Sequence, residues 1–297
     1  MTFHVIGFGA LNVDKLYKVN MIAREEEEGF VIDFKEAPGG SAANTVVGLA
    51  RLELKTGYIG KLAEDREGEL LINDFKKENV DTSGIIISKK GRSGVVMGYV
   101  DGKGERALYV DPGVNDWLEF KEINLDYAAD TEFLHLTSFV GEKPFEAQKQ
   151  LANQLSEVKV SFDPGALYAR KSLTSLKPII KRSFVMLPNQ NEISLLTGKD
   201  YEGGSRTLIK EGVGVVAVKL GERGCYVTDG KERHLVEPYE KKVVDTTGAG
   251  DAFCAGFLYG LIKRRDLYEC GRLGNFIAAR CISKFGATTG LPRLSDM

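Results

Sequence analysis

The chain is poor in the residues on which metal-binding and redox proteins depend. Its 297 residues include only four cysteines and three histidines. No cysteine stands in a C-x-x-C pair and no histidine lies at zinc-ligand spacing from one, which argues against a structural zinc site. The histidines are too scattered to suggest a Ser-His-Asp triad. Cys254, Cys270 and Cys281 lie in helical, apolar surroundings, so we expect core thiols in a reducing compartment.

The chain also lacks an excess of either charge and any long apolar run. Lysine and arginine number 40 against 42 for aspartate and glutamate, which gives a net charge of −2. This balance gives no reason to expect binding to nucleic acid or to an anionic membrane surface. No apolar stretch approaches the roughly 18 residues of a membrane span, and the N-terminus has no signal-peptide pattern. We therefore expect a cytoplasmic protein.

Short strand-like runs alternate with helical patterns along most of the chain. The strand candidates are rich in Val, Ile and Phe and cover residues 4–9, 57–59, 85–87, 133–136, 158–162, 184–187, 215–219 and 225–228. Helical patterns cover residues 44–52, 69–77, 145–155, 173–181, 192–196, 204–210, 252–263 and 266–285. This alternation predicts an α/β fold with a mostly parallel central sheet and helices on both faces. We expect a single domain over residues 1–297.

Two stretches, residues 15–37 and 94–110, break the alternation because they have strand character without an intervening helix. In the second stretch, Asp101-Gly102-Lys103-Gly104 is a good hairpin turn between two apolar runs. We expect the two stretches to pair in a small β lid. Ligands of open α/β sheets bind outside the carboxyl ends of the strands, so a lid there would exclude water from a reaction.

The most informative stretch is Asp245-Thr-Thr-Gly-Ala-Gly-Asp251, which small and apolar residues follow at once. Gly248, Ala249 and Gly250 leave backbone N–H groups uncovered ahead of a helix, whose amino end carries partial positive charge. Such a turn suits a phosphate. Asp251 in the same turn is a candidate general base, so the stretch indicates phosphoryl transfer to a hydroxyl group. Taken alone, these residues could equally form an ordinary glycine turn with a helix cap.

The N-terminal region rules out two common nucleotide-binding motifs. Gly7-Phe8-Gly9 follows the first strand, but Asn12 replaces the third glycine of a dinucleotide fingerprint, and no P-loop occurs. Asn12 and Asp14 stand just past the strand, where an amide and a carboxylate could grip the hydroxyls of a sugar or could cap a turn.

A second glycine stretch, Pro38-Gly39-Gly40-Ser41-Ala42-Ala43-Asn44, leads into a helix. Gly39 and Gly40 let the backbone approach a ligand closely, and Asn44 projects from the first helical turn. A glycine turn capped by Ser41 would explain the same residues structurally.

These motifs, in this order and over nearly the whole chain, closely resemble the ribokinase-like (PfkB) carbohydrate kinase family. The Ser161–Gly165 stretch and the Gly-Gly-Ser block are most similar to archaeal nucleoside kinases and ribokinases. The resemblance implies that the sugar is bound by Asn12, Asp14, Gly39, Gly40 and Asn44. It implies that the nucleotide is bound by Asn189, Lys219, Gly221, Gly224 and Asn275. It also implies a water-mediated Mg²⁺ contact at Glu192 and a K⁺ site at Asp245 and Thr247.

We therefore expect an ATP- and Mg²⁺-dependent kinase that phosphorylates a hydroxymethyl group of a sugar or nucleoside. Asp251 would be the base, and the N–H groups of Gly248–Asp251 would stabilise the developing charge. A fructokinase or 2-keto-3-deoxygluconate kinase is an alternative within the family, and a non-catalytic sugar- or nucleoside-binding sensor is one outside it. Lids of relatives commonly pair across a dimer, and open strand edges favour pairing, so we expect a homodimer through the lid.

Overall fold

A nine-stranded sheet runs through the middle of the molecule, and the computed structural model describes all 297 residues. The strand order is β13-β12-β11-β10-β9-β8-β1-β4-β5, and every pair is parallel except those that involve β12 and β13. The strands are β1 (Phe3–Phe8), β4 (Thr56–Ala63), β5 (Val80–Ser88), β8 (Thr131–Thr137), β9 (Lys159–Asp163), β10 (Ser183–Met186), β11 (Val215–Lys219), β12 (Cys225–Thr228) and β13 (Arg233–Val236). The predicted mostly parallel sheet is confirmed.

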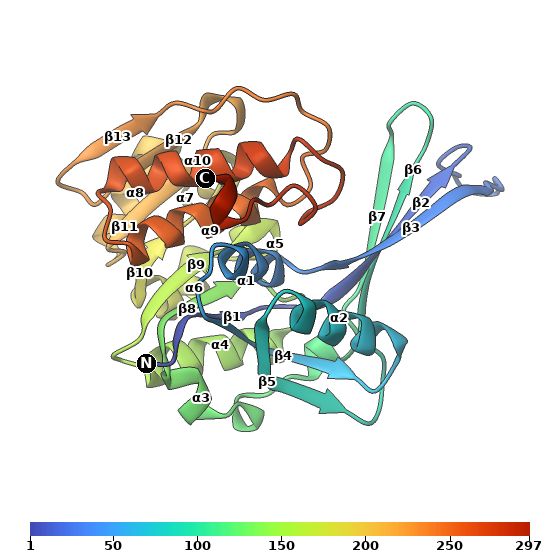
Figure 1. The fold of residues 1–297 in the computed structure, drawn as a ribbon, viewed down its shortest axis with the longest axis horizontal. Helices are drawn as coiled ribbons and strands as arrows, with labels where there is room; N and C mark the ends of the chain where they lie inside the picture. The colour runs from blue at the N-terminus through green and yellow to red at the C-terminus, as the bar shows by residue number, and fades with distance from the viewer.

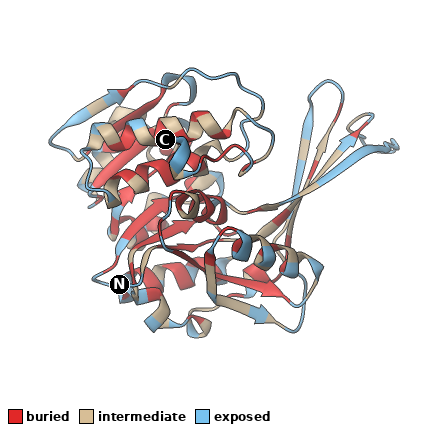
Figure 2. Ribbon diagram, viewed as in Figure 1, coloured by how far each residue is buried: buried red, intermediate tan, exposed pale blue.

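Helices cover both faces of this sheet, and each face has its own apolar core (Figures 1 and 2). One face carries α1 (Ser41–Arg51), α2 (Arg66–Lys77), α9 (Ala249–Ile262) and α10 (Leu267–Cys281). The other carries α3 (Leu125–Ala129), α4 (Glu142–Gln154), α5 (Gly165–Ala169), α6 (Leu173–Ile180), α7 (Gln190–Thr197) and α8 (Tyr201–Lys210). Short 3₁₀ helices are η1 (Gly113–Trp117), η2 (Phe120–Glu122), η3 (Gly221–Arg223) and η4 (Leu294–Asp296). None of the helices combines the length and apolar character that a membrane crossing requires.

The small residues after the glycine turn let α9 pack closely between two other helices. A Cβ on Gly48 of α1 would lie 2.9 Å from the Cβ of Ala255, and one on Gly256 would lie 2.4 Å from the backbone oxygen of Leu273 in α10. The approach of α1 to α9 brings the amino ends of these two helices together. Cys254, Cys270 and Cys281 are buried and unpaired, as expected for core thiols, and Cys225 is buried and unpaired as well.

The predicted elements are present, with differences at their ends. The helix expected at residues 266–285 ends at Cys281, and a loop with a left-handed Gly286 follows. The prediction missed β13, α3 and α5. Each has only four or five residues, too few to show a hydrophobic period, and Leu235 of the edge strand β13 is 61% exposed.

The expected lid is a second sheet of four strands that projects from the body of the molecule (Figure 1). Its order is β3-β2-β6-β7, formed by β2 (Asn12–Val19), β3 (Val31–Gly39), β6 (Gly94–Val100) and β7 (Arg106–Asp111). The β6–β7 hairpin turns at Asp101–Gly104 as predicted, and the carboxylate of Asp101 accepts hydrogen bonds from the backbone of Lys103 and Glu105.

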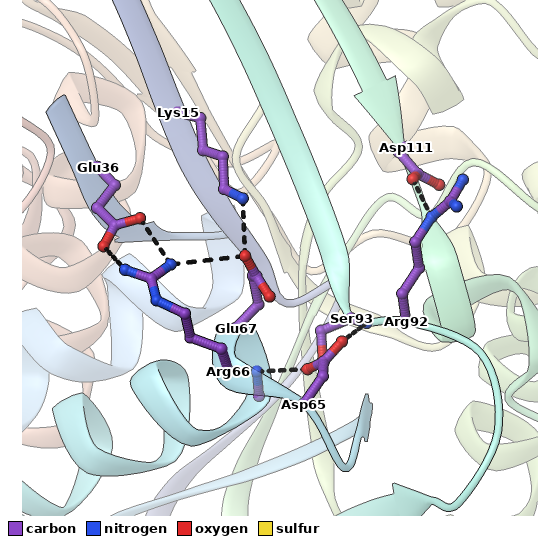
Figure 3. Close-up of polar contacts among 9 residues, drawn as sticks. Lys15, Glu36, Asp65, Arg66, Glu67, Arg92, Ser93 and Asp111 are labelled. Carbon is purple, nitrogen blue, oxygen red and sulfur yellow. Dashed lines mark hydrogen bonds and ion pairs between the residues drawn. The ribbon is translucent and has the colours of Figure 1, made fainter. Parts of the chain in front are cut away.

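Ion pairs fix the base of this lid to the amino end of α2 (Figure 3). Lys15 of β2 contacts Glu67 at 2.7 Å, and Arg66 contacts Glu36 of β3. Asp65 caps α2 through the N–H of Gly68 and also accepts two hydrogen bonds from Ser93 at 2.7 Å, just before β6. Three of the four lid strands are therefore held by one helix end.

A ladder of four aromatic rings crosses the lid. Tyr17 lies 4.9 Å from Phe34 and 5.1 Å from Tyr99, and Tyr99 lies 6.0 Å from Tyr109, between ring centroids. Because side chains alternate along a strand, Tyr17 points to the face opposite Asn12 and Asp14. Phe34 and Tyr109 are 44% and 60% exposed, so the ladder is open to solvent.

Candidate functional site

Two cavities meet at the amino end of α9. The smaller, of about 420 Å³, lies under the lid, whose residues Val96 and Val110 line it. The larger, of about 790 Å³, lies between the loops after β9, β10 and β11 and helix α10. The residues that line both are Ser41, Thr137, Ser138, Thr246, Ala249, Gly250 and Asp251. A group bound in one cavity can therefore reach a group bound in the other across the glycine turn.

Asp251 stands in the first turn of α9, where the two cavities join. The turn requires Gly248, which has a left-handed φ of 76°, and any Cβ there would lie 2.6 Å from the Cα of Ala287. The Asp251 carboxylate accepts a 2.8 Å hydrogen bond from the side-chain amide of Asn44 in α1. Burial raises the pKa of Asp251 to about 7, although the Asn44 hydrogen bond acts in the opposite direction. A carboxylate with this pKa is suited to general-base catalysis near neutral pH.

The backbone of the same turn offers unsatisfied donors. The N–H groups of Gly248, Gly250 and Asp251 have no acceptor in the protein, while that of Ala249 donates to the carbonyl of Thr246 at 3.2 Å. Of the four N–H groups expected to bind an anion, three are therefore free to bind one. Together with the helix dipole they can hold a phosphoryl oxygen.

The residues predicted to bind sugar gather in the smaller cavity, with one exception. Asn12, Asp14, Gly40 and Asn44 line it, whereas Gly39 does not. Gly39 instead leaves space for the side chain of Asp14, because a Cβ at position 39 would lie 2.5 Å from the Asp14 carboxylate. Burial raises the pKa of Asp14 to about 6, and its carboxylate has no hydrogen-bond partner in the protein. It is thus available for substrate hydroxyl groups.

Two residues of η1 complete the smaller cavity, and no motif or hydrophobic pattern indicated them. The buried side chain of Asn115 bonds both the N–H and the C=O of Leu11, and its amide donates to Asn12 at 3.3 Å. Asn12 is thereby oriented with its own amide donor unused. Asp116 also lines the cavity, and its carboxylate accepts the N–H of Gly141 at 2.8 Å.

Asn189 and Glu192 form a reciprocal cap at the start of α7. Asn189 accepts the N–H of Glu192 at 2.9 Å, and Oε2 of Glu192 accepts the N–H of Asn189 at 2.7 Å. Both line the larger cavity. Burial, and after it the charge of Asp163, raise the pKa of Glu192. Its Oε1 has no partner, so this carboxylate fits a magnesium ion held through water beside nucleotide phosphates.

The other residues predicted to bind nucleotide also line the larger cavity. Gly221 and Gly224 bound η3 after β11, and both have left-handed φ angles. Asn275 of α10 donates to the carbonyls of Val236 and Glu237 at 3.1 and 2.9 Å, so it positions the loop that follows β13. Lys219 ends β11 and forms an ion pair with Asp163, at the end of β9. Asp163 follows a buried strand just as Asp14 does, a signal that could have identified it.

Asp245 joins the glycine turn to the loop after α10. Its carboxylate accepts the hydroxyl and N–H of Thr247 at 2.7 and 3.0 Å and the N–H of Gly286 at 2.9 Å. Only Thr247 lines the smaller cavity. Asp245 thus orders the turn by hydrogen bonds alone, and K⁺ binding there stays a prediction.

Two cavities that meet at a candidate base and an anion-binding turn define a phosphotransferase for small molecules. The family description "pfkB family carbohydrate kinase" matches residues 4–294, and the chain belongs to this family. The chain is 48% identical over 253 residues to an uncharacterized sugar kinase of Archaeoglobus fulgidus, covering 84% of this chain and 100% of the relative.

Further relatives agree with this family. An ATP-dependent ribose-1-phosphate kinase of Halopiger xanaduensis is 30% identical, with 95% of this chain and 93% of the relative covered. The solved ribokinase of Thermotoga maritima superposes with a TM-score of 0.89 at 25% identity, covering 99% of this chain and 97% of that one. The chain therefore has the ribokinase-like fold and is a kinase of the sugar-kinase type, and kinases of this family use ATP, generally with Mg²⁺.

The contact between Gly39 and Asp14 can be tested directly. Gly39→Ala should turn the Asp14 carboxylate away from its present position and raise KM for the phosphoryl acceptor by about 10- to 100-fold, as expected when a charged hydrogen bond is lost. KM for ATP should stay unchanged. Gly102→Ala is the matched control, because a Cβ at that hairpin position meets nothing within 4 Å. An unchanged acceptor KM in Gly39→Ala would show that Asp14 does not bind the acceptor.

Proposed function

We propose that the chain transfers the γ-phosphoryl group of ATP to a hydroxymethyl group of a neutral sugar or nucleoside. The observation that carries this proposal is the place of Asp251, whose carboxylate lines both cavities beside the unsatisfied N–H groups of its turn. The acceptor occupies the smaller cavity and ATP the larger. The phosphoryl group would then pass from ATP in the larger cavity to the acceptor in the smaller one.

In the proposed reaction, Asp14, Asn12 and Asn44 hold the acceptor so that its hydroxymethyl oxygen faces Asp251. The carboxylate takes the hydroxyl proton while the oxygen attacks the γ-phosphorus in line. The N–H groups of Gly248, Gly250 and Asp251 receive the charge that develops on the phosphoryl oxygens. A magnesium ion near Glu192 would neutralise charge on the phosphates when bound.

The charge of the smaller cavity favours a neutral acceptor. Asp14, Asp116 and Asp251 line it, and no lysine or arginine does. Three carboxylates without a cation repel an anionic substrate. We therefore favour a furanose, free or in a nucleoside, over a sugar phosphate or 2-keto-3-deoxygluconate, and fructose stays an alternative.

An acceptor panel tests this proposal. Phosphoryl transfer from ATP should be measured for adenosine, cytidine, ribose, fructose, 2-keto-3-deoxygluconate and ribose-1-phosphate. We expect turnover with neutral acceptors only. Running the panel in KCl and in NaCl at equal ionic strength also tests the proposed K⁺ site, because K⁺ should increase turnover. Preferred use of ribose-1-phosphate would contradict the inference from cavity charge, and no transfer to any acceptor would contradict the proposed function.

The base assignment predicts a specific pH dependence. Asp251 must be ionised to accept a proton, so kcat/KM should fall as the pH falls through about 7, the pKa of its buried carboxyl. Asp251→Asn should lose about 10²- to 10⁴-fold in kcat with little change in KM. Asp126→Asn removes an exposed carboxylate on α3 and serves as the control. Near-normal turnover of Asp251→Asn would exclude this residue as the base.

We also propose that two copies associate through their lids. The ladder of Phe34, Tyr17, Tyr99 and Tyr109 has half-buried central rings and exposed end rings, Phe34 and Tyr109. It lies on a sheet whose two edge strands, β3 and β7, have no further partner. An apolar face of this kind typically marks an interface.

Sedimentation at micromolar concentration tests the dimer. The wild-type protein should sediment as a dimer, and Tyr109→Glu should convert it to monomers because it places a charge within the ladder. Leu235→Glu, which changes an exposed residue of β13, should leave the dimer intact. A wild-type protein that sediments only as a monomer would refute the proposal.

A further inference from the structure

Lys219 and Asp163 form an ion pair in the wall of the larger cavity. The ammonium of Lys219 lies 2.5 Å from Oδ2 of Asp163, and the two side chains are only 13% and 8% exposed. The same carboxylate oxygen accepts the thiol of Cys254 at 3.3 Å. Burial lowers the pKa of Lys219, but the neighbouring acidic groups, Asp163 first and then Cys254 and Glu192, together more than offset this effect. The pKa therefore lies above its usual value and the amine stays charged.

The ammonium has donors to spare and lies against the glycine turn. Of its three N–H groups, one is bonded to Asp163, and no other acceptor in the protein contacts it. Its nitrogen lies 3.4 Å from the position that a Cβ on Gly250 would occupy. A side chain at position 250 would therefore separate the ammonium from the turn. Because Gly250 has none, the charge of Lys219 lies beside the glycine turn at Gly250, which lines both cavities.

A purely structural role explains this pair poorly. Removing two charges from water costs free energy for each, and a buried ion pair recovers that cost only when its remaining donors are satisfied. Two donors of Lys219 are not. Its side chain lines the larger cavity together with Asn189, Glu192 and Asp251, so the unused donors face the space assigned to the nucleotide phosphates.

We propose that Lys219 binds the γ-phosphoryl group of the nucleotide during transfer, from the nucleotide side of the glycine turn, while Asp163 positions its ammonium. This assignment rests on the proposed function. During the reaction the bond between the γ-phosphorus and the β,γ-bridging oxygen breaks, and that oxygen leaves with ADP. The acceptor oxygen forms the new bond, its proton passes to Asp251, and Lys219 keeps its own proton throughout.

The first test compares three variants: Lys219→Met, Asp163→Asn and the double variant. Lys219→Met should lower kcat by about 10²- to 10³-fold, as loss of one preorganised donor to a transition state does. Asp163→Asn should lose less, because the ammonium remains. The double variant should recover thermal stability relative to Lys219→Met, since no unpaired carboxylate is left, but should not recover kcat. Recovery of kcat in the double variant would show that the pair is only structural.

The second readout is the pH profile of kcat/KM. The groups around Asp251 are Asn44 and Ser41 of α1, Cys254 of its own helix, Cys281 of α10, Tyr58 of β4, and the Lys219–Asp163 pair from β11 and β9. Lys219 is the cation in this set and favours the ionised base. Because loss of this cation raises the pKa of Asp251, Lys219→Met should shift the fall of kcat/KM at acidic pH to higher pH. Lys219→Arg keeps the charge and should return the fall to its wild-type pH. An unshifted fall in Lys219→Met would contradict the proposal.

A measurement of nucleotide binding can distinguish a failure of the role assigned to Lys219 from a failure of the proposed kinase function. Calorimetry with Mg²⁺ and a non-hydrolysable ATP analogue needs no acceptor. Lys219→Met should bind the analogue about 10- to 100-fold more weakly than the wild type and bind ADP equally well. This split would support the role of Lys219 even if the wild type phosphorylated no acceptor in the panel. If the wild type is active and Lys219→Met binds the analogue as tightly as the wild type does, only the role of Lys219 is refuted and the proposed function stands. If Lys219→Met does not fold, the double variant serves for the same measurement.

Discussion

A hydrogen bond of 2.8 Å between Asn44 and Asp251 joins the first turns of α1 and α9, which lie 207 residues apart in the chain. The hydroxyl of Thr45 strengthens this junction through the backbone oxygen of Asp251 at 3.2 Å. Both helices begin directly after a glycine with a left-handed φ angle, Gly40 and Gly248. The junction thus brings two glycine turns together, and the wall shared by the two cavities consists mainly of these turns. Without close contact between α1 and α9, the acceptor and the nucleotide would have no common boundary.

The two cavities differ in whether cations line them. Carboxylates line both, but lysines line only the larger one, through Lys219 and Lys241. In the larger cavity an anionic phosphate can therefore be paired with an ammonium group, whereas in the smaller one it would face carboxylates without a compensating side-chain cation. This difference supports selection of a neutral acceptor, and it disfavours rebinding of the phosphate ester after transfer.

The sequence allowed much of the fold and about half of the site to be predicted, for identifiable physical reasons. Long amphipathic helices and apolar strands have clear periodicity, so the main elements could be predicted. Asn12 and Asp14 could be identified from their place just past a strand, whereas Asn189 and Lys219 are assigned through the family resemblance. Asp116 could not be, because its five-residue 3₁₀ helix has no period. The place of Asp163 at the end of a buried strand could have identified it as a site residue, but not as the partner of Lys219. The two lie 56 residues apart, and only the strand order brings them together.

The lid is anchored at one end only, and this determines how it can move. Lys15 and Glu36 are fixed to α2 near the cavity (Figure 3), whereas no hydrogen bond or ion pair joins the far ends of the strands to the body of the molecule. Asp14 stands next to that anchor. Val19 lies five residues farther along β2, about 17 Å away at the usual rise of a strand, so a rotation of about ten degrees would displace it by about 3 Å and barely move Asp14. The lid can therefore rotate about its base, where Asp14 lies. Such a rotation would open the cavity for exchange of substrate and product while Asp14 keeps its position.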